Sequence, residues 1–351
     1  MLCVVGALAC FGLTNGCGPD LLYLPSLIAG QLQAIAGSVP VEKALEGGNL
    51  DADQQAKLRL IQDARIYAIE TMGLRNSRSF TLFLDLGDST RVYNVSASEP
   101  DSLSEQTWSF PFVGTVPYLG FFDRELAERF RDRLTGEGLD VLMYEVDAYS
   151  LRDLLPNPIR SGMLRRDDLT VIETVIHELL HDTVFRSGDT DFNESLATFV
   201  ARAGTVEYLR DRAFDENIIA DAAERFDDTD AYNAFMFRLF ADLQDYYATD
   251  IGREAKIAGR EAVFQAGRDR FLHDVHPTLH HPESYEWVQR MPTNNAWMLA
   301  NYRYNLDLGL FGEVYAATGF NWANTLDVFR SAAAAPEPKA FLSDWLAARV
   351  D

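Results

Sequence analysis

The pattern of hydrophobic and polar residues divides the chain into a mixed first half and a helical second half. Short apolar runs rich in β-branched and aromatic residues predict strands at residues 80–86, 91–96, 108–113, 116–122 and 140–149. Apolar residues at helical spacing predict helices at residues 21–36, 57–72 and 124–134. A hairpin through Gly87 and Asp88 is expected to join the first two strands. From Asp168 to the C-terminus the pattern is almost wholly helical.

This order of elements is typical of an α+β fold. We expect a small antiparallel or mixed sheet in the N-terminal half and a mainly helical C-terminal half. A single domain over residues 18–351 is predicted, with its sheet at about residues 51–160 and its helices at about residues 161–351. Apolar residues make up 47% of the 351 residues and aromatic residues 12%, which is enough to build a substantial core.

The net charge excludes one class of partner. The chain contains 53 acidic and 31 basic residues, which gives a formal net charge of −22. Such a surface repels the phosphates of nucleic acids. A general nucleic-acid-binding role is therefore not expected.

The first 17 residues have the features of a signal peptide. Residues 2–13 form an apolar run that is too short to cross a bilayer but has the length of a signal-peptide core. All three cysteines lie in this region, and Gly16 precedes the last of them, Cys17. The segment resembles the lipobox of bacterial lipoproteins, which implies that residues 1–16 are removed and that Cys17 is lipidated. We then expect the protein in the bacterial cell envelope, anchored to a membrane and facing the periplasm or the exterior. The alternative is a buried N-terminal helix.

A His-Glu-x-x-His motif is the strongest chemical signal in the sequence. His177 and His181 flank Glu178 in a segment without Gly or Pro that begins after Asp167 and Asp168. On a helix the two imidazoles share one face, one turn apart, where both can bind a single zinc ion. Glu178 is rotated by about 100° from His177 and can reach the zinc-bound water without being a ligand. The sequence therefore predicts a zinc site with Glu178 as general base.

A catalytic zinc needs a third protein ligand, and Glu194 is the candidate. A helix stop is expected at Gly188, and helical spacing resumes at Phe192. If the two helices fold back on each other around Gly188, Glu194 lies level with His181. Small side chains at positions 195, 197, 198 and 201 favour a close approach of the second helix.

These residues resemble a known family. The motif at His177, followed by Asn193-Glu194 and Ala197, is similar to the gluzincin metallopeptidases. From Cys17 the chain is similar over nearly its full length to a family of bacterial lipoproteins described as zinc aminopeptidases. Matching pieces include Gly30-Gln31-Leu32, Tyr93-Asn94-Val95, Phe110-Pro111 with Gly114, Tyr118-x-Gly120-x-Phe122, Ala148-Tyr149-Ser150 and Asn294-Asn295-Ala296 followed by Tyr304. The resemblance implies a gluzincin-like fold, a bound Zn²⁺ and a peptide or protein substrate.

The expected mechanism follows from the zinc and the general base. Zinc would activate a water molecule for attack on a peptide carbonyl, and Glu178 would take the water proton and pass it to the leaving amine. By analogy with gluzincins that use Tyr or His to stabilise the oxyanion, Tyr304 is expected in that role and Tyr302 is the alternative. The sequence has no Gly-x-Met-x-Asn element like the one with which well-known gluzincin aminopeptidases hold a substrate's amino end.

Two further sets of residues are candidates for supporting roles. A substrate would bind as an added strand along a sheet edge, for which residues 114–120 and 146–150 are the candidates by family match. Ordinary sheet strands are an equally good interpretation of both segments. Glu173 and Thr198 are candidates to orient the metal-binding imidazoles, against simple solvation or packing.

The other four histidines, at positions 273, 276, 280 and 281, cluster in one segment with Asp274 and Pro277. Such a segment can bind a metal adventitiously. We expect a surface loop here, because the sequence indicates no partner acid and no regular helix around it.

Two other classes of function compete with a peptidase. One is a lipid-anchored binding or assembly factor whose zinc is not catalytic, and the other is an amidase that acts on non-peptide substrates. Glu178 argues against a purely structural zinc, because such a site does not need a general base next to the metal.

Overall fold

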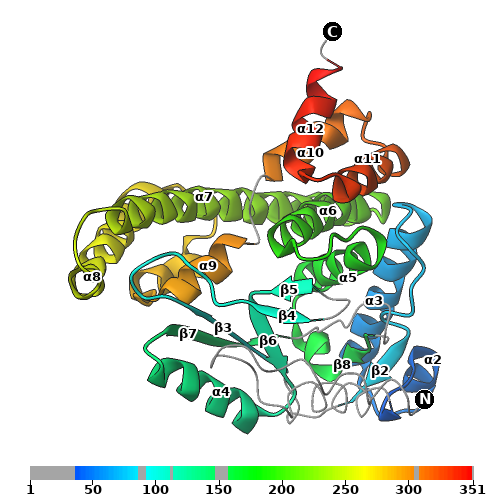
Figure 1. Cartoon of the computed structure of the whole chain (residues 1–351). Coiled ribbons are helices and arrows are strands. Elements are labelled where there is room, and N and C mark those ends of the chain that lie inside the picture. Colours follow the sequence, from blue (N-terminus) through cyan, green and yellow to red (C-terminus); the bar gives the residue numbers. More distant parts are fainter. Residues whose placement is uncertain (1–35, 86–91, 111–113, 147–156, 304–307, 350–351) are drawn as a thin grey trace.

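The computed structural model describes residues 36–85, 92–110, 114–146, 157–303 and 308–349. Cys17, the helix expected at residues 21–36 apart from its last residue, and Tyr304 lie outside the described residues. Within them the expected α+β fold is confirmed, because small sheets occupy the first half and helices the second (Figure 1). No described helix is long and apolar enough to cross a membrane.

The strands form three small sheets. Strands β6 (Tyr118–Phe121), β3 (Val92–Ser98) and β7 (Asp140–Val146) form an antiparallel sheet in that order. Strand β2 (Leu82–Leu84) lies between β1 (Val39–Pro40), which is antiparallel to it, and β8 (Ile159–Arg160), which is parallel. Strand β4 (Trp108–Phe110) pairs with β5 (Gly114–Val116). The sheet part is therefore mixed, as one of the two sequence alternatives predicts.

The prediction of a hairpin between the strands at residues 80–86 and 91–96 is wrong. Strand β3 is paired on one side with β6 and on the other with β7, whereas β2 pairs with β1 and β8 in a different sheet. In the register of β3, Val95 faces Leu119 on one neighbour and Met143 on the other. Strand β3 therefore has both edges occupied and cannot pair with β2.

Helix α4 (Arg124–Gly136) covers the β6-β3-β7 sheet. Its N-cap residue is Asp123, whose carboxylate accepts a hydrogen bond from the Leu126 main-chain N–H at 3.1 Å. Phe130 and Leu134 on its inner face are buried against Val95 and Phe121 of the sheet. These apolar contacts form a core of their own beneath the helical part of the protein.

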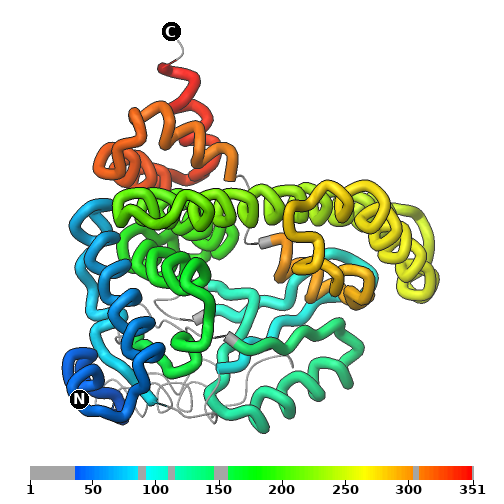
Figure 2. The backbone as a smooth tube through the Cα atoms, turned by 180° about the vertical axis from the view of Figure 1, so that it is seen from behind, coloured from blue at the N-terminus to red at the C-terminus, as the bar shows by residue number. Residues whose placement is uncertain are grey.

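The helical part surrounds the main core. Helix α3 (Ala52–Glu70) packs against α5 (Asp168–Thr183), and α5 packs most closely against α6 (Thr190–Asp211). Helix α7 (Glu216–Tyr247) is the longest and runs across the molecule beyond these helices (Figures 1 and 2). The remaining helices are α2 (Val41–Glu46), α8 (Arg253–Arg270), α9 (Asn295–Arg303), α10 (Leu308–Ala317), α11 (Trp322–Ala334) and α12 (Pro338–Ala347).

One glycine allows α6 to lie close to its neighbours. A Cβ added at Gly204 would come within 2.4 Å of the Met72 side chain and within 3.3 Å of the Ile176 side chain. Met72 and Ile176 are both fully buried, so neither can move aside freely. The close packing of α6 on α5, which brings Glu194 to the histidines, therefore depends on a residue without a side chain.

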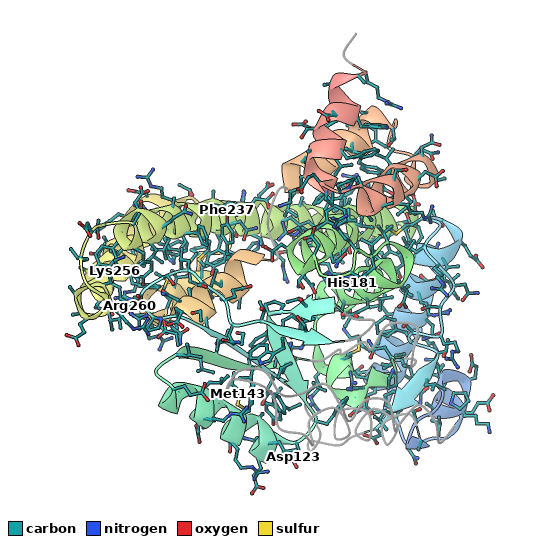
Figure 3. The ribbon with its side chains drawn as sticks, viewed as in Figure 1. Asp123, Met143, His181, Phe237, Lys256 and Arg260 are labelled. Atoms are coloured by element: carbon teal, nitrogen blue, oxygen red, sulfur yellow. The ribbon has the colours of Figure 1, made fainter. Side chains whose placement is uncertain are left out.

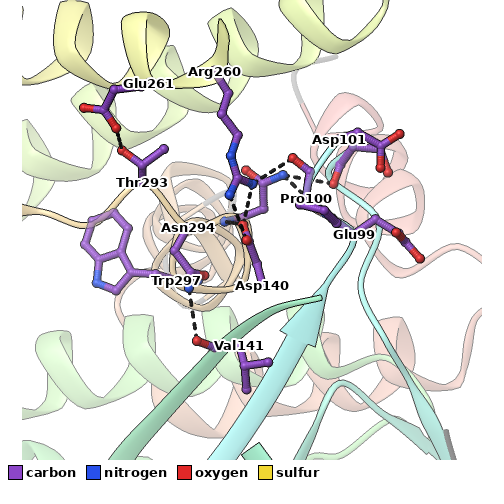
Figure 4. A network of polar contacts seen from close by, with 12 residues as sticks. Glu99, Pro100, Asp101, Asp140, Val141, Arg260, Glu261, Thr293, Asn294 and Trp297 are labelled. Atoms are coloured by element: carbon purple, nitrogen blue, oxygen red, sulfur yellow. Dashed lines mark hydrogen bonds and ion pairs between the residues drawn. The ribbon is translucent and has the colours of Figure 1, made fainter. Parts of the chain in front are cut away.

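A buried polar network joins the far end of the helical part to the sheet (Figure 4). The Arg260 guanidinium on α8 binds both carboxylate oxygens of Asp140, at 2.6 and 2.9 Å. The fully buried Asn295 donates its main-chain N–H to Asp140 at 2.6 Å and accepts from the Tyr247 hydroxyl at 3.0 Å. Asn294 donates to the Val141 carbonyl at 3.0 Å. The Asn294-Asn295 pair therefore anchors the start of α9 to β7 and α7.

The histidine-rich segment is not a free surface loop. It forms a π turn at Phe271–Val275 and 3₁₀ turns at His276–Thr278 and Pro282–Arg290. Acidic residues of the regular helix α7 lie beside it, with Asp221 and Glu224 both within 4 Å of His281. The expectation that no acid and no regular helix lies beside these histidines is therefore wrong. The sequence gives no sign of the packing of this segment against α7.

Candidate metal centre

Helix α5 presents both motif histidines on one face. Asp167 caps its first turn by accepting the Thr170 main-chain N–H at 3.1 Å and the Thr170 hydroxyl at 2.6 Å. One face of the helix is buried in the main core through Val171, Ile172, Val175, Ile176, Leu179 and Leu180. His177 and His181 lie between this buried face and the solvent, with side chains 19% and 12% exposed.

The loop after α5 is held by a reciprocal pair of hydrogen bonds. The Asn193 side chain accepts from the Arg186 main-chain N–H at 2.8 Å and donates to the Arg186 carbonyl at 2.7 Å. Gly188 takes a positive φ of 80° within this turn, and Asp189 caps α6 by accepting the Phe192 N–H at 3.1 Å. These contacts fix how α6 starts relative to the end of α5, and Glu194 is the next residue after Asn193.

Arg186 also ties this turn to the C-terminal helices. Its guanidinium donates to the main-chain carbonyls of Ala333 at 3.1 Å, Pro336 at 2.6 Å and Ala335. These carbonyls lie at the C-terminal end of α11, where a cation is favoured by the helix dipole. The turn between the two site helices is therefore braced from outside by the C-terminal part of the chain.

The structure brings the three predicted ligands together. His177 Nε2 lies 3.1 Å from Glu194 Oε2 and 3.1 Å from His181 Nε2. His181 Nε2 lies 3.6 Å from Glu194 Oε2, and the two imidazole rings are nearly perpendicular, at 85°. Figure 3 shows His181 at the α5–α6 pair, away from Arg260 at the other end of the helical part. The expected fold-back of α6 onto α5 is thus confirmed.

The spacing of these donor atoms fits a zinc ion. Zinc binds imidazole nitrogen and carboxylate oxygen at about 2.0–2.2 Å, so two ligands of a tetrahedral ion are about 3.3–3.5 Å apart. The three observed distances, from 3.1 to 3.6 Å, bracket this value. The group of His177, His181 and Glu194 can therefore hold a metal ion with little movement.

The charges at the site favour a cation. Burial acts to raise the pKa of the Glu194 carboxyl, but the charges and hydrogen bonds of His181 and His177 outweigh burial and hold this pKa below its usual range. Glu194 is only 8% exposed, so its negative charge is little screened by water. An ionised carboxylate buried beside two imidazoles is the donor set that a divalent metal requires.

Glu178 has a different environment from Glu194. Burial raises the pKa of the Glu178 carboxyl, although the charges of His181 and His177 act to lower it. It lies on the same helix as the two histidines but is not part of the group of metal-binding atoms. Its carboxyl is therefore separate from the atoms that could hold a metal ion.

The two proposed supports for the imidazoles are not found. No hydrogen bond joins Glu173 or Thr198 to either motif histidine within the described part of the chain, and the charges that act on the pKa of Glu173 are Arg202, Asp167 and Arg225. The Nδ1 atom of His181 is buried and has no hydrogen-bond partner there either. The packing of α5 and α6 therefore orients this ring.

The supports that the structure does contain lie outside the motif. Asp182, next to His181, accepts hydrogen bonds from the hydroxyls of Ser77 at 2.6 Å and Ser79 at 2.8 Å. Asn193 and Arg186 close the turn between the helices, as described above. Sequence spacing does not reveal these contacts, because each joins a motif neighbour to the main chain or to a distant loop.

The candidate oxyanion tyrosines are only partly described. Tyr304 lies outside the described residues. The Tyr302 ring stacks on Phe240 of α7 at 4.0 Å and meets Phe237 edge to face at 5.0 Å. Tyr302 is therefore a packing residue between α9 and α7.

Both segments suggested for substrate binding contain edge strands. Residues 114–120 include β5 and most of β6, and residues 146–150 begin at the last residue of β7 and otherwise lie outside the described residues. In the described sheet, β6 and β7 each pair only with the central strand β3. They are therefore the two outer strands of this sheet among the described residues.

The comparisons with known proteins give one result. A family model described as "Putative aminopeptidase" matches residues 22–341. Neither the search of curated proteins nor the search of solved structures finds a match. The family match spans the sheet part, the histidine motif and the C-terminal helices together.

Proposed function

Because the chain belongs to the "Putative aminopeptidase" family, we propose that it is a zinc-dependent peptidase with aminopeptidase activity. His177, His181 and Glu194 would hold the zinc, and Glu178 would act as the general base. One observation carries the proposal: two imidazoles and a buried carboxylate converge within 3.6 Å on adjacent helices, with Glu178 next to His177.

Bound zinc supplies a Lewis acid that polarises the peptide carbonyl and makes water more acidic. Glu178 takes a proton from the attacking water and then gives it to the leaving amine. The raised pKa that burial gives to the Glu178 carboxyl helps it to hold the proton between these two steps. His177 and His181, fixed by the packing of α5, would keep the metal ion in place on the helix that carries Glu178.

The proposal for the oxyanion donor remains Tyr304, which belongs to the Asn294-Asn295-Ala296 region. The alternative, Tyr302, is weakened by its ring stacking on Phe240. A hydroxyl near the metal would stabilise the developing negative charge.

A membrane location is part of the same proposal. Lipidation at Cys17 would hold the catalytic part at a bacterial membrane, facing the periplasm or the exterior. Labelling with a radioactive fatty acid in a bacterial host tests it. Label is expected in the wild-type protein and not in Cys17→Ala, and label in both proteins would contradict it.

The test of function is a Glu178→Gln variant assayed on a mixed peptide library with zinc content measured in parallel. We expect wild-type cleavage to begin at peptide amino ends, and the variant to lose at least about 100-fold in rate while keeping its zinc. Glu125→Gln is the matched control, because Glu125 is 81% exposed on α4 and should leave activity unchanged.

The same experiment separates the competing functions. Zinc binding without cleavage of any peptide by the wild-type protein would favour a binding or assembly factor. Hydrolysis of simple amides but not of peptides would favour an amidase. Cleavage that persists in Glu178→Gln would contradict the assigned general base.

A further inference from the structure

Helix α5 carries a further acidic side chain in line with the metal-binding histidines. Glu173, His177 and His181 follow one another at intervals of four residues, which places them in one stripe along the helix. All three are partly exposed, whereas their neighbours Ile176 and Leu180 are buried in the main core. The stripe that holds the two motif histidines therefore also includes a carboxylate, one turn toward the start of α5.

The Glu173 carboxylate has no ion-pair partner within the described residues. The two cations whose charges act on it are bound to other acids, because Arg202 pairs with Asp230 at 2.8 Å and Arg225 with Asp221 at 2.8 Å. Burial raises the pKa of the Glu173 carboxyl to about 7, although the side chain is still partly exposed. A carboxylate surrounded by protein atoms and left without a partner favours a cation that enters from the solvent.

We propose that Glu173 binds the α-ammonium group of a peptide substrate whose first carbonyl lies at the His177 centre, and that it thereby directs cleavage to the first peptide bond. This inference rests on the proposed peptidase function. It assigns a residue to the recognition of the substrate's amino end, for which the sequence has no Gly-x-Met-x-Asn element.

The dimensions of a peptide fit this arrangement. Four residues of an α-helix advance about 6 Å, which is the separation of Glu173 from His177 along α5. The α-amine nitrogen of a peptide lies about 2.5 Å from its own carbonyl carbon, and an ammonium group approaches a carboxylate to about 2.8 Å. Each further residue would move the amino end by about 3.5 Å. Glu173 is therefore within reach of the amino end of the first residue and too close to the centre for longer leaving segments.

Charge makes the same selection. A free amino end supplies the positive charge that Glu173 lacks, and the pair is little screened where protein atoms surround it. An acetylated amino end is neutral, so it would leave the carboxylate without a partner. Glu173 therefore determines specificity for free amino ends, whereas Glu178 acts on the water.

The test is isothermal titration calorimetry of the zinc-loaded full-length protein with the amides of alanine, leucine, phenylalanine and lysine, and with the N-acetylated form of each amide. The wild-type protein is expected to bind free amides and not acetylated ones. Glu173→Gln should bind the best free amide about 10- to 100-fold more weakly, the range of a hydrogen bond between charged groups. Glu173→Asp keeps the charge and should lose less.

Kinetics on peptides gives a second measurement. Glu173→Gln should raise KM about 10- to 100-fold on peptides with a free amino end, change kcat less and keep its zinc. Asp168→Asn is the matched control, because it removes a negative charge from the first turn of the same helix at a side chain that is 60% exposed. It should keep the wild-type affinity for amides. A circular dichroism spectrum like that of wild type establishes that each variant is folded.

Four results would overturn the proposal: no free amide binds to the wild type, acetylated amides bind as tightly as free ones, Glu173→Gln binds free amides as tightly as wild type, or Asp168→Asn loses as much affinity as Glu173→Gln. The proposed function fails separately. If amides bind through Glu173 but no peptide is cleaved, the peptidase assignment is wrong and the amine site stands. If peptides are cleaved and Glu173→Gln keeps its amide affinity, the reverse holds.

Discussion

The centre on α5 and α6 and the histidine-rich segment beside α7 both place histidines near carboxylates. They differ in the backbone structure that carries the histidines. In each, one buried side chain holds a neighbouring stretch through two main-chain hydrogen bonds: Asn193 holds Arg186, and Asp228 holds His280 and His281. In the first the histidines are one helical turn apart and the carboxylate is buried, whereas in the second they are adjacent and the acids are half-exposed. A regular helix therefore converts sequence spacing into ligand spacing, and irregular turns do not.

The largest expected effect is on zinc binding at the centre on α5 and α6. Glu194→Ala removes the buried carboxylate between the imidazoles and leaves two neutral donors, so zinc affinity at this centre should fall by more than about 100-fold. Competition with a chromophoric chelator measures the change, and Glu178→Gln serves as the control that keeps zinc. An unchanged zinc affinity in Glu194→Ala would contradict the assignment of Glu194 as a metal ligand.

A second prediction concerns Glu173, which lies on α5 one turn before His177. Burial raises its pKa to about 7 from a usual 4.5, so the folded state binds more protons than the unfolded state between these values. The free energy of unfolding therefore falls as pH rises through this window, and the cost is complete above about pH 7. Glu173→Gln should raise the free energy of unfolding at pH 8 by up to about 3 kcal/mol and have little effect at pH 4.5.

Urea unfolding of the wild-type protein and of Glu173→Gln at both pH values checks this prediction. The same gain at pH 4.5 and at pH 8 would mean that the titration of Glu173 is not the cause.

A third prediction tests whether Asp228 holds the backbone of the histidine-rich segment. Asp228→Ala leaves the N–H groups of His280 and His281 without their acceptor and should cost about 1–3 kcal/mol of stability. Hydrogen exchange should become faster at residues 279–282, while α5 and α6 keep their protection. The exposed neighbour Asp227 gives the control variant Asp227→Ala. Faster exchange throughout the chain would show that the segment is not an independent unit.

The smallest expected effect lies at Asn193, the counterpart of Asp228 in the first centre. Asn193→Ala removes both hydrogen bonds to Arg186 and should weaken zinc binding by about tenfold, because Glu194 then loses part of its fixed position. Asn193→Asp keeps the acceptor for the Arg186 N–H and should weaken binding less. Equal affinities in wild type and Asn193→Ala would show that helix packing alone places Glu194.

The same contrast explains what could be predicted from the sequence. Helix α4 and strand β3 were predictable to within a few residues, because their apolar spacing is local. Helix α3 begins earlier than its apolar spacing indicates, at Ala52, where Asp51 and Gln54 form a capping box. The partner of β2 was not predictable, because β8 lies some 75 residues further along the chain and pairs through tertiary packing.

The site follows the same rule. His177, His181 and Glu194 were predictable because two helices and one short turn determine their spacing. The roles of Asn193 and Arg186 were not, since they depend on the conformation of the turn and on carbonyls near Ala335. The acids around His281 were missed for a related reason, because they come from a helix about 60 residues earlier in the sequence.

Anomalous diffraction at the zinc edge from crystals of the zinc-loaded protein tests most directly whether His177, His181 and Glu194 share one ion. The strongest peak is expected about 2.0–2.2 Å from His177 Nε2, His181 Nε2 and a carboxylate oxygen of Glu194. A strongest peak elsewhere, or a Glu194 carboxylate turned away from the two imidazoles, would contradict the assignment of a catalytic zinc to these helices.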